Sequence, residues 1–131
     1  MERQEQATTL AAAIHCFDAG QYLAAHELFE ELWEASEGLE SDFFKGFVQA
    51  AICLHHFEAG NLEGAVKLYS GHRRCLAPFL PNHEGIDVAR FLVDMQRALR
   101  PVLDRPLGGT AAFPEGARPR IFPPTPVTPP G

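Results

Sequence analysis

Two stretches decide the fold: "HCFDAGQYLAAHELFE" at residues 15–30 and "HHFEAGNLEGAVKLYS" at residues 55–70. Each places an alanine–glycine pair between two runs in which apolar residues recur every three or four positions. Glycine lets a chain reverse after a helix, because it adopts a positive φ without steric cost. The repeat therefore predicts two helical hairpins. Its six identities, at an offset of 40 residues, are His15/His55, Phe17/Phe57, Ala19/Ala59, Gly20/Gly60, Ala25/Ala65 and Leu28/Leu68.

The same periodicity predicts about five helices over residues 1–101. They end at Gly20, span 21–36, span 41–59, run from Asn61 to about Pro78, and run from Val88 to Leu99 before Pro101 closes the last one. Ser41 and Asn61 are predicted N-caps. No segment alternates with a period of two, so no strands are expected. The stretch 41–59 is apolar nearly all round and should be the central helix. We expect an all-α, up-down bundle with tetratricopeptide-like (TPR-like) hairpins, although the 40-residue offset exceeds the usual 34.

Beyond the bundle the composition changes. Residues 101–131 contain nine of the eleven prolines and show no periodicity, which predicts a proline-rich extended tail over residues 102–131. One alternative is a disordered tail. The other is an arm that docks on its own bundle or on a neighbour's, anchored by Phe113, Ile121 and Phe122.

Length and charge restrict the classes of function. A chain of 131 residues with a net charge of −6 is one domain. Seven acidic residues and no basic one lie between Glu27 and Asp42, which argues against nucleic-acid binding. This acidic face either keeps the domain soluble or docks a basic partner.

The sequence predicts neither a membrane span nor a signal peptide. No apolar run approaches the roughly 18 residues of a membrane span, and "MERQEQATTL" lacks the apolar stretch of a signal peptide. The three cysteines, Cys16, Cys53 and Cys75, favour reduced thiols in the cytoplasm.

Several polar side chains fall on the inward faces of the predicted helices. Helical phase turns His26 inward and Glu27 outward, and Glu30 flanks the inward arc. In a zinc-protease helix, two histidines four residues apart bind the metal and the glutamate beside them acts as base. Here Glu30 stands at the second histidine position, so a zinc-protease site is excluded. The polar residues predicted at the interior or its rim are His26, Glu30, Gln49, His56 and His72.

Three interpretations of these residues remain open. They form a structural hydrogen-bonded cluster, a ligand pocket with acid–base chemistry, or a metal site. Zinc would take His26, Glu30 and His56, with His72 as a further donor, but no ligand pair has a diagnostic spacing. The chain contains no glycine-rich phosphate loop, nucleophile elbow or Cys-x-x-Cys motif. No catalytic residue is therefore assigned.

The stretch "GQYLAAHELFEELWE" and the later "FFKGFVQAAICLHHFEAGNLEGAVKLY" resemble the DUF309 family, small helical proteins of unknown function. The resemblance covers about residues 15–76 and implies a helical hairpin bundle without naming an activity. Lys45 stands where the family pattern has glutamine. The matching positions are Gly20, Tyr22, Ala25, His26, Glu27, Glu30, Trp33, Gly46, Gln49, His56, Gly60, Asn61, Gly64 and Ala65. The resemblance makes His26, Glu30, Trp33, Gln49 and His56 the predicted ligand-binding set.

Together these features predict a non-enzymatic helical module that binds a peptide or a partner protein and could form a homodimer. The alternative is an enzyme or a small-ligand or metal-binding protein, with its site centred on His26 and Glu30. No cofactor is predicted, and zinc belongs only to this alternative.

Overall fold

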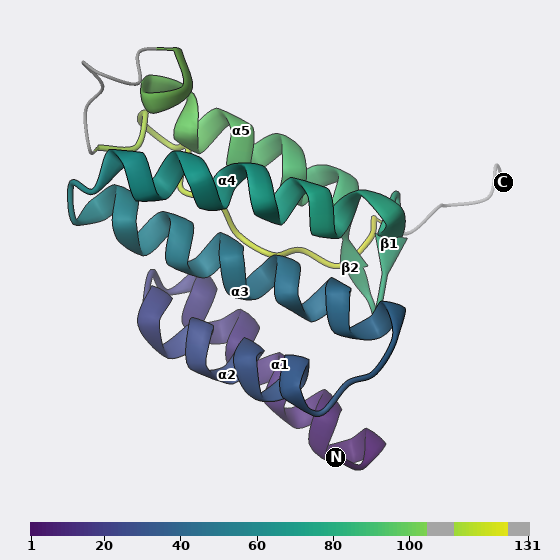
Figure 1. Ribbon diagram of the computed structural model, residues 1–131. Coiled ribbons are helices and arrows are strands. Elements are labelled where there is room, and N and C mark those ends of the chain that lie inside the picture. The colour runs from purple at the N-terminus through teal and green to yellow at the C-terminus, as the bar shows by residue number, and fades with distance from the viewer. Residues whose placement is uncertain (105–111, 126–131) are drawn as a thin grey trace, which may run out of the picture.

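The computed structural model describes residues 1–104 and 112–125. This part of the chain forms five α-helices, one 3-10 turn and one two-stranded hairpin (Figure 1). The prediction of about five helices is confirmed. In chain order the elements are α1 (Arg3–Asp18), α2 (Tyr22–Glu34), α3 (Leu39–Glu58), α4 (Leu62–Leu76), η1 (Ala77–Phe79), β1 (Asn82–His83), β2 (Ile86–Asp87) and α5 (Val88–Asp104).

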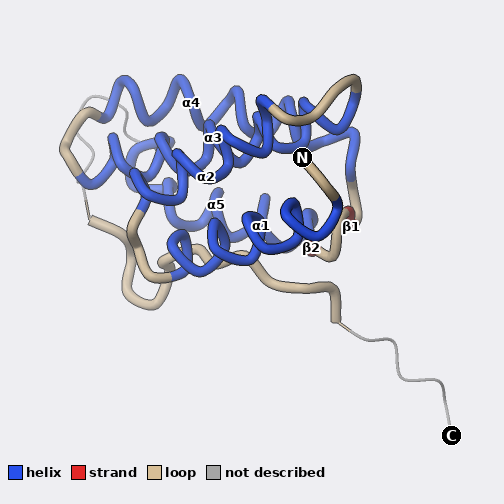
Figure 2. The backbone as a smooth tube through the Cα atoms, turned by 90° about the horizontal axis from the view of Figure 1, so that it is seen from below, coloured by secondary structure: helices blue, strands red, loops and turns tan. Residues whose placement is uncertain are grey.

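The helices form two layers. Helices α2, α3 and α4 lie side by side in one layer, and α1 and α5 lie in the other (Figures 1 and 2). Phe47 of α3 joins the layers, because its ring stacks on Phe29 of α2 at 5.2 Å and contacts Phe91 of α5 at 4.9 Å between centroids. Phe91 in turn contacts Phe17 of α1. Ten residues of α3 are buried, so the prediction that this helix is central is confirmed.

The repeated turns adopt the same conformation. Gly20 and Gly60 have φ values of 79° and 83°. After each glycine the next amide returns to the helix, from Gln21 to the Cys16 carbonyl at 2.9 Å and from Asn61 to the His56 carbonyl at 2.8 Å. These bonds satisfy carbonyls that the helix end would leave unpaired. The predicted reversals at both glycines are confirmed. Asn61 also caps α4 as predicted, because its side chain accepts the Gly64 amide.

Close contact between α3 and α4 depends on small residues. A Cβ added at Gly46 would lie 2.6 Å from Cγ of Leu76, which is fully buried on α4. A Cβ at Gly71 would meet the Gln49 side chain across the same interface. Helix packing therefore explains the glycine at Gly46, one of the positions that match the family pattern.

The expectation of no strands is wrong. Strands β1 and β2 pair antiparallel, with Asn82 opposite Asp87 and His83 opposite Ile86. The turn between them is made by Glu84 and Gly85, both at positive φ, as tight hairpin turns require. Two-residue strands are too short to give a period of two, so the sequence pattern cannot reveal them.

Two predicted helix ends are also wrong. Helix α3 begins at Leu39, because Gly38 takes the N-cap position at a φ of 63° and its carbonyl accepts the Ser41 amide. Helix α5 continues past Pro101 to Asp104. The proline removes the hydrogen bond to the Arg97 carbonyl, but Arg97 lies at the surface and Val102 is fully buried. Burial of Val102 holds the last turn against the bundle.

Residues 112–125 lie against the second layer, between α1 and α5 (Figures 1 and 2). The Ile121 amide donates to the Asp18 carboxylate at 2.8 Å, and the Phe122 carbonyl accepts the Asp87 amide at 2.8 Å. The Ile121 side chain is buried. Arg118 donates to the Tyr22 hydroxyl at 2.6 Å. Residues 105–111 and 126–131 of the predicted tail lie outside the described residues.

Candidate functional site

The predicted site begins with His26 and Glu30 on α2. Nε2 of His26 lies 3.2 Å from Oε2 of Glu30, and the two side chains are 25% and 40% exposed. Nδ1 of His26 is buried and has no hydrogen-bond partner within the described residues. An exposed pair of this kind contributes at most about 1 kcal/mol to stability. The pair therefore lies at the surface of α2, whereas Nδ1 of the imidazole is buried and unpaired among the described residues.

The other three predicted residues have partners of their own. Trp33 lies beneath the Lys45 ammonium, 6.0 Å from the ring centroid. Gln49 accepts the Cys75 thiol, and Nδ1 of His56 lies 3.3 Å from the Asn61 side-chain nitrogen. In residues 1–104 and 112–125, no hydrogen bond or ion pair joins these three to His26 or Glu30. The structure thus separates the predicted set into local pairs, and a ligand-binding role for it stays a prediction.

His72 of α4 is the fully buried polar residue of the core. Its Nδ1 donates to the Tyr69 carbonyl, and its Nε2 has no hydrogen-bond partner among the described residues. Burial is the main cause that lowers the pKa of His72 to about 4; the hydrogen bond to the Tyr69 carbonyl opposes this shift, and the nearby Arg73 guanidinium adds to it. At neutral pH this imidazole is uncharged. The predicted inward orientation of His72 is confirmed, and the side chain lies in the hydrophobic core.

Burial also keeps two thiols protonated. The Cys53 thiol donates to the Ala65 carbonyl, and burial raises its pKa to about 12. Burial likewise raises the pKa of Cys75. A thiolate is the reactive form of cysteine, so burial disfavours the reactive form of both side chains.

A groove runs along α1. Its volume is about 690 Å³, and Glu40 of α3 and Glu84 of the hairpin turn line it together with residues of α1. The floor contains Ala7, Leu10 and Ile14 of α1, which follow one another at helical spacing. The full lining is Met1, Arg3, Gln6, Ala7, Leu10, Ala11, Ile14, Glu40 and Glu84. The groove therefore has an apolar floor and two carboxylates on one wall.

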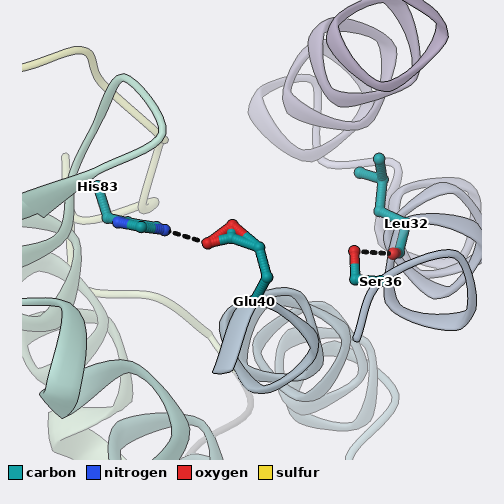
Figure 3. A network of polar contacts seen from close by, with 4 residues as sticks. All are labelled: Leu32, Ser36, Glu40 and His83. Carbon is teal, nitrogen blue, oxygen red and sulfur yellow. Dashed lines mark hydrogen bonds and ion pairs between the residues drawn. The ribbon is translucent and has the colours of Figure 1, made fainter. Parts of the chain in front are cut away.

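Glu40 also meets a histidine that sequence reasoning missed. Nε2 of His83, on β1, makes a hydrogen bond to Oε1 of Glu40 (Figure 3). The imidazole packs against the rings of Phe43 and Phe79, at centroid distances of 4.7 and 4.8 Å. The two partners are 43 residues apart, and helical periodicity carries no signal for contact between a helix and a short hairpin. Only Gly85 marks the turn in the sequence.

One group in the described part of the chain has donors placed to hold a metal ion. It consists of Glu40, His83 and Glu84, with one donor atom of each within 4.8 Å of the others. His26, Glu30 and His56, all described, do not form such a group. The three residues of the predicted metal alternative thus do not come together as one group of donors.

Comparison with known proteins concerns the first part of the fold. Residues 10–68, from α1 to the first half of α4, match one sequence family. That family is DUF309, a domain of unknown function. The resemblance is confirmed for these residues, here called the DUF309 region. Glu40 lies inside the DUF309 region, whereas His83 and Glu84 lie beyond it.

A longer protein is also similar. An uncharacterized protein of Aquifex aeolicus is 26% identical over 95 residues, which cover 72% of this chain. The matched region is only 28% of that protein's length. Neither DUF309 nor this relative carries a named activity, so function has to be argued from geometry. Within the part of the chain that the structure describes, no helix has the length and apolarity needed to cross a membrane.

Proposed function

We propose that this protein is a non-enzymatic interaction module whose groove along α1 binds an amphipathic, basic helix of a partner protein. The observation that carries the proposal is the groove itself, with its apolar floor and its wall of Glu40 and Glu84. Helix-in-groove recognition uses apolar anchors of the partner at positions i, i+3, i+4 and i+7. A floor built from one helical stripe of α1 matches that spacing.

Charge selects the partner. The chain has a net charge of −6, and the groove adds two carboxylates close to where a bound helix would lie. Opposite charge on the two surfaces raises the rate of encounter and fixes the register. Arg3 is the basic residue of the groove lining, and in the bound state it would pair with an acidic group at one end of the partner helix. A basic helix with an acidic end therefore fits best.

The hairpins support the same proposal. Helices α1 and α2, and α3 and α4, are joined by equivalent glycine turns, which favours the TPR-like interpretation. Stacked hairpins of that kind present helical surfaces to extended or helical peptides. The contacts of residues 112–125 favour the docked alternative for the proline-rich tail. The three free cysteines favour a reducing, cytoplasmic location.

A labelled model peptide tests the proposal. The probe is a fluorescein-tagged helix with leucine at helical spacing, a glutamate at one end and lysine at the other positions. Its binding is measured by fluorescence anisotropy at low and high salt. Binding should weaken with salt, and Ala11→Arg should reduce the affinity about tenfold or more, because arginine fills the groove and repels lysine.

Ala12→Arg is the matched control. Ala12 is exposed beside Ala11 on α1 but does not line the groove, so the affinity should change by less than about twofold. Equal losses in both variants, or no binding by the unaltered protein, would contradict the proposal. If sedimentation shows a homodimer that Ala11→Arg dissociates, the occupant of the groove is a second copy of this chain and not a partner peptide.

A second candidate function is a small-ligand site on α2. It rests on the unpartnered Nδ1 of His26 and on Glu30, which lines a cavity of about 490 Å³ together with Ala24, Glu27, Leu28, Glu31 and Glu34. A thermal-shift screen of small polar compounds tests it. Compounds that raise the melting temperature should lose the effect in His26→Asn and keep it in Glu37→Gln, which changes an exposed glutamate outside the cavity lining. A screen without hits, or hits that survive His26→Asn, would remove this candidate.

A further inference from the structure

We infer that Glu40, His83 and Glu84 form a binding site for a divalent first-row transition-metal ion such as zinc. The site shares Glu40 and Glu84 with the lining of the proposed peptide groove, but the inference does not depend on peptide binding. It is also distinct from the metal alternative at His26, Glu30 and His56. Four features carry the inference: the convergence of three donors, the fixed imidazole, a free carboxylate oxygen, and charge.

Three parts of the chain bring the donors together. Glu40 stands in the first turn of α3, His83 ends β1, and Glu84 follows in the hairpin turn. Their donor atoms lie within 4.8 Å of one another. Ligands bound to one ion at distances of about 2.0 to 2.2 Å are themselves a few ångströms apart. Small side-chain movements are therefore sufficient to place an ion among them.

The imidazole is already oriented for binding. Its ring packs against both Phe43 and Phe79, and its backbone pairs with Ile86, which is buried. Nε2 points at Glu40 (Figure 3). A metal ion would take the place of the proton that Nε2 shares with the carboxylate, as in other sites where neutral histidine binds a metal. Less side-chain freedom is then lost on binding.

Glu40 has a second oxygen that the protein does not satisfy. Oε2 is buried and has no hydrogen-bond partner in residues 1–104 and 112–125. A buried carboxylate oxygen without a partner is unfavourable, and a cation would remove that penalty. Oε1 contacts His83, so the carboxylate could bind an ion with Oε2 while staying next to the imidazole.

Charge and access favour a divalent ion. The two carboxylates together carry a charge of −2, and no ion pair joins Arg3, in the same groove, to either carboxylate within the described residues. One nitrogen and two carboxylate ligands suit zinc and its first-row neighbours better than calcium or magnesium, which prefer oxygen alone. Both glutamates line the groove, and Glu84 is exposed, so water could complete the coordination.

Calorimetric titration of the EDTA-treated full chain with zinc alone tests the inference. The unaltered protein should bind one ion per chain. Glu40→Gln should weaken the binding about tenfold or more, since loss of even an outer-shell partner of a metal site has that effect. Glu84→Gln should act in the same direction. Glu84 is exposed in the turn, so Glu84→Gln tests the metal site even if Glu40→Gln lowers the stability of the protein.

Controls separate this site from others. Glu37→Gln changes an exposed glutamate three residues before Glu40, and His26→Asn changes the other histidine that pairs with a glutamate. Both should bind zinc like the unaltered protein. In nuclear magnetic resonance spectra, the His83 imidazole signals should shift on addition of zinc, whereas those of His15 should not. The inference is overturned by the absence of stoichiometric binding, or by binding that His26→Asn removes while Glu40→Gln and Glu84→Gln leave it intact.

Discussion

Leu76→Ala should lower the free energy of unfolding by about 2 to 5 kcal/mol. Leu76 is fully buried on α4, and its side chain packs over Gly46 of α3. Removing Cγ and its two methyl groups leaves a cavity at the contact between α3 and α4. Urea denaturation measures the loss. Leu39→Ala is the matched control, because Leu39 is 74% exposed and its truncation should cost under about 0.5 kcal/mol.

Gly46→Ala should be destabilising by about 1 to 3 kcal/mol in the unaltered background, since the new Cβ meets Leu76. In the Leu76→Ala background the same change should cost far less or stabilise, because the methyl group fills the cavity and alanine favours the helix. The double variant should therefore be more stable than the sum of the single losses implies. Additive losses would contradict the assignment of Gly46 to this close contact.

Acid should destabilise the protein through His72. Burial holds its pKa at about 4, whereas in the unfolded chain it is about 6.5. Below pH 6.5 the unfolded state binds a proton that the folded state excludes. The free energy of unfolding therefore decreases as the pH is lowered, until the folded state also binds the proton near pH 4. The difference of about 2.5 units corresponds to about 3 kcal/mol lost between pH 7 and pH 4.

Comparison with His72→Gln isolates this contribution. Glutamine does not titrate, so the variant should lose about 3 kcal/mol less than the unaltered protein between pH 7 and pH 4, whatever its stability at pH 7. Urea unfolding at a series of pH values provides the measurement. His15→Gln, at an exposed position of α1, should leave the pH dependence unchanged. Parallel curves for the unaltered protein and His72→Gln would show that His72 is accessible to water.

The helical part of the fold could be predicted because its signals are local. Gly20 and Gly60 follow apolar runs, and both adopt the positive φ that the repeat requires. The 3.6-residue periodicity also predicted that His72 faces inward, and its side chain is fully buried. Each of these features depends on residues within one or two turns of a helix, so a single sequence contains enough information.

The features that sequence missed depend on contacts between distant segments. Pro101 normally ends a helix, but burial of Val102 keeps α5 intact. The contact between Glu40 and His83 requires the position of a hairpin that periodicity does not reveal. Helical phase also cannot show how far two inward-facing residues lie along their helices. For that reason His26 and His56, each correctly placed at the rim, have separate partners.

We propose that this protein acts through the groove that α1 forms with Glu40 and Glu84. Backbone amide spectra of the ¹⁵N-labelled chain, recorded during titration with the lysine–leucine probe, test it most directly. We predict shift changes concentrated at residues 3–14 of α1, at Glu40 and at Glu84, with little change along the outer face of α2. Changes centred on residues 24–34, or no saturable change at all, would contradict the claim.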